Sequence, residues 1–489
     1  MRVLKKSVAI ILVLLIAITN LSGCSYILPF LDDLVPSESL ISSDTAAVSS
    51  EEGGESTSSK KSGTQNKSSS SKKQSSSSKP VGSATKKETL STDSSVKDPQ
   101  NVGKIKELVI SSKHTAVKSS SYYQYSSSTG TIKTLYNLIL TAIKNSRNVV
   151  NFTNITPSKE QISIAYQRVL ADHPQFFYVS RSFWYISGTK SNNIKALVLS
   201  YFDGEVSDEI DDDLNFIKTA DRTVINQKID KLKTEIEKIL STIPLEESEV
   251  IKEKKIYDYV LNKVRYEKVA AENSENVLFA HYFDLYGAVV NKTSVCEGYA
   301  KMFQYLCYCV SINATQVIGV GNKEDHMWNA VLIEGEWYQA DLTWSDTDMA
   351  WSDLTRIFDY SYFNQTTENI LKDHTIDSSC LAVPVCNSTK NSFINLFAIE
   401  ITDLNSPPAN YENVVANIIK SGSNRIYVYV NRDGSVVGNL NFSRNYERYI
   451  NNNMIYEGSD FNIYLSNLGI TLSREIKKIE NFYVLTLNY

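Results

Sequence analysis

The stretch TSVCEGYAKMFQYL, residues 293–306, decides how the centre of this chain folds. Ser294 followed three positions later by Glu297 has the pattern of a capping box, so we expect Ser294 to be the N-cap of a helix and Cys296 its second residue. Gly298 in the first turn leaves room for another backbone or a substrate to approach. Small and apolar residues then recur at the spacing of one helix face: Cys296, Ala300, Phe303, Cys307 and Val310.

The helix pattern leaves two interpretations of Cys296. Unpaired N–H groups and the helix dipole favour an anion at a helix N-terminus, which suits a nucleophilic thiol. Free cysteine is also among the most buried residue types, and on an apolar face Cys296 is equally well explained as core. A disulfide with Cys307 is excluded within one helix, because eleven residues rise about 16 Å. The decision depends on a partner base.

A second stretch, DHMWNAVLIEGEWYQADLTW at residues 325–344, offers that base. Apolar residues on both sides of Glu334-Gly335 predict a β-hairpin. A two-residue or a four-residue loop places His326 opposite Thr343, so that Asp341 lies diagonally across on the same face of the sheet. A three-residue loop would put His326 and Asp341 on opposite faces.

With His326 and Asp341 on one face, a Cys-His-Asp set is complete. Cys296 would be the nucleophile, His326 the general base and then the acid, and Asp341 the group that orients the imidazole.

Three blocks carry a family resemblance: VCEGYA (295–300), HMWN (326–329) and WYQADLTW (337–344). They resemble the signature blocks of the bacterial transglutaminase-like superfamily. The resemblance covers roughly residues 245–376 and implies an α+β fold with a papain-like core, in which the cysteine helix packs on an antiparallel sheet. It also implies a Cys-His-Asp triad and acyl chemistry on amides through a thioester: hydrolysis, crosslinking or deamidation.

The remaining site residues are predicted without a sequence motif. The backbone N–H of Cys296 is the natural first oxyanion donor, and Tyr286 or Asn291 is a candidate second one. We interpret Trp328 and Trp344 as walls of a cleft. His281 and His374 are interpreted as structural.

We predict no cofactor and no metal. The cysteine spacings fit no zinc pattern, and Asp346-Thr347-Asp348 is not continued as an EF-hand loop, so calcium dependence is not expected.

The N-terminus predicts export. A basic start and the apolar run 8–18, too short to span a bilayer, indicate a signal peptide. Leu21-Ser22-Gly23-Cys24 resembles the lipobox of bacterial lipoproteins, which implies lipidation of Cys24. The alternative is an ordinary secretory signal with an incidental cysteine. Residues 42–100 consist largely of Ser, Lys, Thr, Gly and Glu, which predicts a disordered tether.

Elsewhere, periodicity predicts helices at 131–144, 158–170, 208–240 and 247–264, and strands at 176–179 and 195–202. Asp211-Asp212-Asp213 is interpreted as a solvated helix face. The predicted organisation is a signal peptide (1–23), a tether (24–103), an N-terminal α/β region (104–205), a transglutaminase-like catalytic domain (206–385) and a C-terminal α/β region (386–489).

The combined prediction is a lipid-anchored cysteine enzyme on the outer face of the bacterial cell membrane. Its substrate would be a peptide or protein, with cell-wall peptide as one candidate, and the reaction would be hydrolysis or acyl transfer. A formal net charge of -5 over 489 residues gives no case for nucleic acid. The alternative is a non-catalytic surface lipoprotein that retains the fold for binding or as a scaffold.

Overall fold

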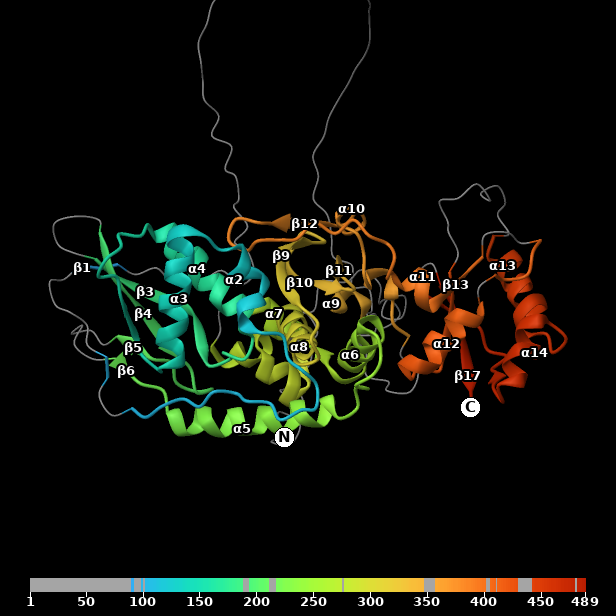
Figure 1. The fold of residues 1–489 in the computed structure, drawn as a ribbon, viewed down its shortest axis with the longest axis horizontal. Helices are drawn as coiled ribbons and strands as arrows, with labels where there is room; N and C mark the ends of the chain where they lie inside the picture. Colours follow the sequence, from blue (N-terminus) through green and yellow to red (C-terminus); the bar gives the residue numbers. More distant parts are fainter. Residues whose placement is uncertain are drawn as a thin grey trace, which may run out of the picture. The chain divides into compact units, whose positions relative to one another are not determined.

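The computed structural model describes eleven segments of the chain, shown in colour in Figure 1: 89–91, 98–99, 102–187, 193–210, 217–274, 277–346, 357–401, 405–409, 411–429, 442–479 and 482–489. The predicted signal peptide, Cys24, nearly all of the tether, Asp211-Asp212-Asp213 and Thr347-Asp348 lie outside these segments. In the described segments, no helix combines the length and the apolar character needed to cross a membrane.

The first region is built on a four-stranded sheet of order β1-β3-β4-β2. The predicted helices are present, and Ser158 and Gln161 form a reciprocal capping box that starts the second of them. The predicted strand at 176–179 is wrong. The N–H of Phe176 donates to the carbonyl of His173, and the N–H of Val179 donates to the carbonyl of Phe176. These hydrogen bonds form turns, so the strand begins only at Val179. The elements are β1 (Thr89–Ser91), α2 (Tyr123–Ser127), α3 (Gly130–Lys144), β2 (Val149–Asn151), α4 (Lys159–Asp172), β3 (Val179–Ser187) and β4 (Ile194–Tyr201).

The helix predicted to begin at Asp208 begins later. Asp208 is fully buried and accepts hydrogen bonds from Arg222, Asn148 and the N–H of Ala220, so it serves as a buried anchor before the helix. Asp221 is the N-cap, because its side chain accepts a hydrogen bond from Thr223 N–H. The segment contains β5 (Glu209–Ile210), β6 (Ile217–Lys218) and α5 (Arg222–Leu240).

The central region places the cysteine helix on an antiparallel sheet. Four strands pair in the order β11-β10-β9-β12, every neighbouring pair antiparallel. Helix α8 packs on β10 and β9 and also contacts α6. The predicted fold class, α+β with this papain-like arrangement, is confirmed. The main elements are α6 (Glu249–Lys263), β7 (Arg265–Tyr266), α7 (Lys268–Glu272), β8 (Thr293–Ser294), α8 (Cys296–Cys309), β9 (Ala314–Gly321), β10 (Glu324–Ile333), β11 (Glu336–Ala340), α9 (Leu342–Ser345), α10 (Thr367–Ile370) and β12 (His374–Asp377).

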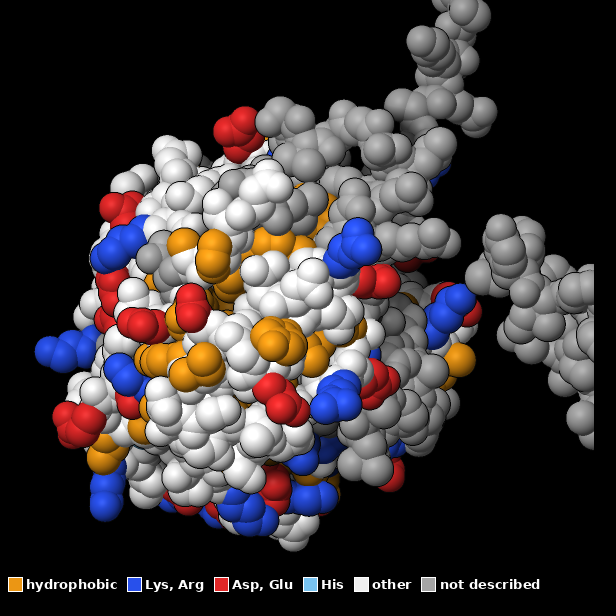
Figure 2. Space-filling model, turned by 90° about the vertical axis from the view of Figure 1, so that its right-hand side faces the viewer, with side chains coloured by type: hydrophobic (Ala, Val, Ile, Leu, Met, Phe, Trp, Pro, Cys, Tyr) orange, Lys and Arg blue, Asp and Glu red, His pale blue; other side chains and the backbone are white. Residues whose placement is uncertain are grey.

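The last region has a mixed sheet of order β13-β14-β17-β15, with β16 also paired to β17. It holds a hydrophobic cluster of its own, around Val415, Ile450 and Leu485. A separate cluster joins side chains from Ile105 to Val484. Hydrophobic side chains also reach the surface, as Figure 2 shows for one face of the molecule. The elements are α11 (Phe393–Phe397), β13 (Ala398–Glu400), α12 (Tyr411–Ser421), β14 (Arg425–Tyr429), α13 (Phe442–Ile450), α14 (Asp460–Asn467), β15 (Thr471–Leu472), β16 (Lys477–Ile479) and β17 (Phe482–Asn488).

Candidate active site

The β10–β11 hairpin has the predicted register. Ile333 pairs with Glu336 across a two-residue turn, and both turn residues, Glu334 and Gly335, have positive φ (50° and 86°). Such a turn matches the twist of the flanking strands. The pairing ends at Asn329 and Ala340, however, so the expected pair of His326 with Thr343 does not form.

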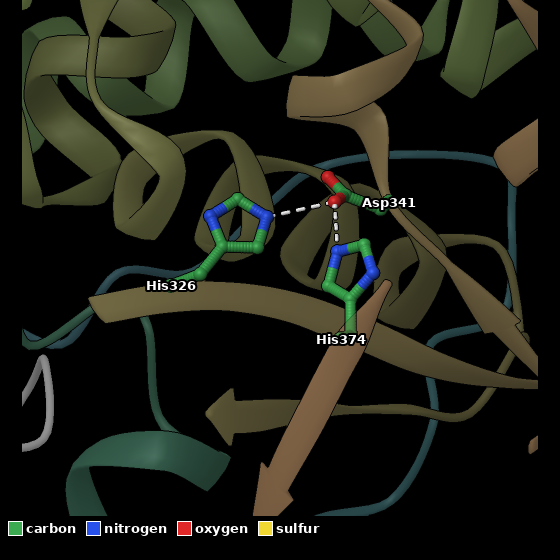
Figure 3. Close-up of side chains that lie close together, drawn as sticks. All are labelled: His326, Asp341 and His374. Atoms are coloured by element: carbon green, nitrogen blue, oxygen red, sulfur yellow. Dashed lines mark hydrogen bonds and ion pairs between the residues drawn. The ribbon is translucent and has the colours of Figure 1, made fainter. Parts of the chain in front are cut away.

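Asp341 leaves the sheet at this point and becomes the N-cap of α9. Its Oδ1 accepts hydrogen bonds from the backbone N–H groups of Thr343 (2.8 Å) and Trp344 (3.1 Å). Its Oδ2 lies 2.7 Å from Nε2 of His326 (Figure 3). The contact predicted from the hairpin is therefore present, although a helix cap rather than a strand presents the carboxylate.

Both partners are buried, and each changes the protonation of the other. Burial alone lowers the pKa of His326, but the attraction and hydrogen bond of Asp341 outweigh it and raise the pKa from 6.5 to about 10. Burial alone would raise the pKa of Asp341, but His326 holds it well below its usual range. The pair therefore favours an imidazolium next to a carboxylate.

Cys296 contacts the same imidazole. A side-chain hydrogen bond with Cys296 contributes to the raised pKa of His326. Because Nε2 of His326 faces Asp341, Nδ1 is the ring nitrogen left for the thiol. Three other thiols are buried as well. Burial raises the pKa of Cys309 to about 12 and that of Cys386 to about 11, and it also raises the pKa of the Cys307 thiol well above its usual value.

The predicted capping box in front of Cys296 is wrong. Helix α8 begins at Cys296 itself, with Val295 as an N-cap that makes no side-chain cap bond. Ser294 belongs to β8, and its hydroxyl donates to the carbonyl of Tyr282 (2.6 Å). Cys296 is thus the first helical residue, one position earlier than predicted, and still lies where backbone N–H groups are free.

Glu297 does not reach back to cap the helix either. Its buried carboxylate lies between Lys301 (2.6 Å) and Arg181 (3.3 Å). Gly298 provides the predicted close approach, but to the chain itself. A Cβ added to Gly298 would lie 1.7 Å from Oγ of Ser294 and 3.2 Å from the carbonyl oxygen of Asp284. Glu297, through its ion pairs, and Gly298, through its close packing, therefore both fix the segment that carries Cys296.

The predicted supporting residues divide into two groups. Trp328 and Trp344 flank His326, each with a ring-centroid distance of 5.8 Å. Tyr286 instead stacks on Phe177, and Asn291 is an exposed residue at the end of η3 (Gly287–Asn291). Neither position supports the predicted role of Tyr286 or Asn291 as an oxyanion donor.

His374, which we interpret from the sequence as structural, lies at the site. Its Nε2 lies 3.2 Å from Oδ2 of Asp341, the same oxygen that His326 contacts (Figure 3). His281, the other histidine interpreted as structural, bridges Asp284 and Lys228. Spacing offers no signal for His374, because it follows Asp341 by 33 residues and reaches it through β12.

His326, Asp341 and His374 also have the donor types of a transition-metal site, with one ligand atom of each within 4.8 Å of the others. The two hydrogen bonds to Oδ2 of Asp341 account for this closeness without an ion. The arrangement therefore fits a hydrogen-bonded histidine–carboxylate cluster.

Comparison with known proteins agrees with this geometry. Residues 241–342 match the model of the transglutaminase-like superfamily, a segment that contains Cys296, His326 and Asp341. Kyphoscoliosis peptidase of mouse and of human are each 24% identical over 137 residues, 25% of this chain. The match spans 20% of the length of these curated relatives.

Two solved structures are also similar in part. One, described as a candidate cysteine protease from Cytophaga hutchinsonii, is 22% identical and has a TM-score of 0.19, covering 23% of this chain and 37% of that one. The other, described as a TGase, is 15% identical with a TM-score of 0.23, covering 38% and 57%. Neither superposition is close enough to carry an argument. The family match and the α8–sheet arrangement identify a transglutaminase-like domain in this chain.

Proposed function

We propose that the transglutaminase-like domain is a cysteine enzyme that acts on peptide or protein amides through a thioester. The observation that carries this proposal is the position of His326, whose Nε2 bonds to the buried carboxylate of Asp341 while the ring also contacts the Cys296 thiol. A nucleophile, a base and a group that orients the base are the three parts that such chemistry needs.

In the proposed reaction, the proton of the Cys296 thiol resides on Nδ1 of His326, in keeping with the imidazolium that Asp341 favours, and Sγ attacks the amide carbonyl carbon as a thiolate. The oxyanion would be met by backbone N–H groups at the start of α8, which have no intrahelical acceptor. The C–N bond then breaks, His326 returns the proton to the leaving amine, and a thioester remains on Cys296. Attack by water releases an acid and restores the thiol, whereas attack by an amine forms a new amide.

We favour hydrolysis slightly over acyl transfer, because water is always available to the thioester. We further propose that lipidation of Cys24 holds the enzyme at the outer face of the bacterial cell membrane, with peptides of the cell wall or surface proteins within reach of the tether. This location rests on the N-terminal sequence, which lies outside the described residues.

The test is alkylation of the full chain with iodoacetamide across pH, in a Cys24→Ser background. Mass spectrometry of the peptides follows Cys296 and, as an internal reference, the partly exposed Cys380. We expect Cys296 to react faster than Cys380 near neutral pH, and a His326→Ala variant to lose that advantage while Cys380 is unchanged. If Cys296 and Cys380 react at equal rates in both the wild type and the His326→Ala variant, the enzyme proposal is rejected and a non-catalytic binding lipoprotein is favoured.

If Cys296 is reactive, the reaction class needs a second measurement. A glutamine-peptide library is incubated with and without a labelled amine. Labelled peptides indicate acyl transfer, whereas shortened or deamidated peptides alone indicate hydrolysis.

A further inference from the structure

His374 lies between two carboxylates. Its Nε2 faces Oδ2 of the buried Asp341 at 3.2 Å, and its Nδ1 faces Oδ1 of Asp373 at 2.5 Å. An ionised carboxylate can only accept hydrogen bonds. Each ring nitrogen of His374 faces a carboxylate oxygen, and an N–H on Nε2 therefore donates to Asp341.

Asp341 uses the donor from His374 to complete its own set. Oδ1 accepts two backbone N–H groups from α9, and Oδ2 accepts His326 and His374. A fully buried carboxylate needs such donors, because each one that is lost leaves charge without compensation. Four donors from three elements hold the carboxylate in one orientation.

We propose that His374 is a positioning residue of this site. It donates a second hydrogen bond to Oδ2 of Asp341, which fixes the carboxylate and thereby sets the orientation of His326. The inference rests on the proposed function of Cys296 and His326. His374 lies beyond the segment that matches the family model, which ends at residue 342. It does not touch the substrate in this proposal, and it acts through Asp341.

The packing around His374 leaves the ring little freedom. Its side chain has no exposed surface. The indole of Trp344 lies 4.2 Å away and that of Trp328 5.0 Å away, measured between ring centroids. The two indoles hold the imidazole in the plane where both nitrogens meet carboxylates.

Asp373 extends the array toward the surface. Its side chain is 41% exposed, and its Oδ2 accepts a hydrogen bond from the hydroxyl of Tyr362 (2.8 Å). The groups that face His374 are thus Asp341 and His326 on the inside and Asp373 and Tyr362 on the outside. Asp373 can be changed with little effect on the core, which makes it a useful second variant.

The experiment measures the alkylation rate of Cys296 against pH in the full chain, in the Cys24→Ser background. His374→Ala removes the donor to Asp341, and we expect an alkylation rate of Cys296 tenfold to a hundredfold lower near neutral pH, the range for one hydrogen bond to a charged group. His374→Gln keeps one N–H donor, so it should recover part of that loss. Asp373→Asn should give a smaller decrease at an unchanged melting temperature, since it loosens only Nδ1 of His374.

Val415→Ala is the control for lost stability, because Val415 is fully buried in the separate C-terminal cluster. It should lower the melting temperature and leave the alkylation rate unchanged. Wild-type rates in His374→Ala and Asp373→Asn would overturn the inference. So would equal losses of rate in His374→Ala and His374→Gln, if Val415→Ala, at a similar drop in melting temperature, lost as much of the rate. If wild-type Cys296 reacts no faster than Cys380, the proposed function itself fails, so the two failures are distinct.

Discussion

The substitution Asp341→Asn isolates the charge on which the proposed chemistry depends. It keeps the shape of the side chain and an oxygen that can still accept from Thr343 and Trp344, so α9 should keep its cap. It removes the negative charge next to His326, whose Nε2 lies 2.7 Å from Oδ2 in the wild-type protein. The imidazolium then loses its main stabilising partner.

The size of the effect follows from Coulomb's law. Two unit charges about 4 Å apart attract each other by about 4 kcal/mol at an effective dielectric constant near 20. This energy corresponds to about a thousandfold in the protonation equilibrium of His326. It agrees with the rise of the pKa from 6.5 to about 10. In Asp341→Asn, the attraction of the carboxylate no longer outweighs the effect of burial, so we expect the pKa of His326 to fall to 6.5 or below.

Carbon-13 NMR of protein labelled at histidine Cε1 measures this directly. The chain has five histidines, and a His326→Gln variant assigns the signal. We expect His326 to remain protonated until about pH 10 in the wild type and to titrate at least two pH units lower, by the estimate above, in Asp341→Asn. A wild-type signal that titrates near 6.5, or one that Asp341→Asn leaves unmoved, would refute the electrostatic account.

The same charge makes stability depend on pH. Because the folded-state pKa of His326 is raised, its contribution to the unfolding free energy is complete below its unfolded pKa of 6.5 and is lost as pH rises to about 10. The melting temperature of wild type minus that of Asp341→Asn should therefore be larger at pH 6 than at pH 10. Activity should fall steeply in the variant, since the same change in a serine protease triad lowers kcat about 10⁴-fold.

Three further substitutions test the surroundings of the site. Gly321→Ala would place a Cβ 2.8 Å from Cζ2 of Trp344, and we expect a Cys296 alkylation rate at least tenfold lower with a melting temperature reduced by a few degrees. Glu297→Gln leaves Lys301 without its buried partner and should cost about 3 kcal/mol, read as a lower melting temperature at pH 7. Because the pKa of Glu297 is lowered in the folded protein, that deficit should shrink as pH falls below 4.5. Tyr257→Phe removes a hydroxyl that donates to the backbone carbonyl of Asp341 (3.0 Å), and should destabilise the chain by about 1 kcal/mol while the pH dependence of alkylation stays unchanged.

The hairpin and the cysteine helix could be predicted because their signals are local. Glu334-Gly335 can adopt positive φ at both turn positions, and that turn alone sets the register of β10 against β11. Register then places His326 near Asp341 without knowledge of the rest of the sheet. The approach of Cys296 to this pair depends on how α8 packs, and there the family resemblance supplied what periodicity could not.

The errors have the opposite origin. Ser294 and Glu297 have the spacing of a capping box, yet tertiary partners take both side chains: the carbonyl of Tyr282 binds one, and Lys301 with Arg181 binds the other. Asp208 likewise has a tertiary partner, the buried Arg222, where propensity predicted a helix. Lys301 lies one turn after Glu297 on the same helix, but Tyr282, Arg181 and Arg222 are distant in sequence from the groups they bind, so no local pattern predicts them.

The contact between His374 and Asp341 could not be predicted from the sequence, because the position of His374 depends on the order of the strands. Strands β10 and β12 both pair with β9 and therefore lie about 10 Å apart, two interstrand spacings. Yet the rings of His326 and His374 lie only 5.5 Å apart, between centroids. Gly321 of β9 lies between them, and a Cβ there would come within 3.4 Å of Cδ2 of both rings. A glycine on the middle strand is thus what allows two imidazoles from its two neighbours to converge on one carboxylate oxygen, so the site depends on a missing side chain as much as on the side chains present.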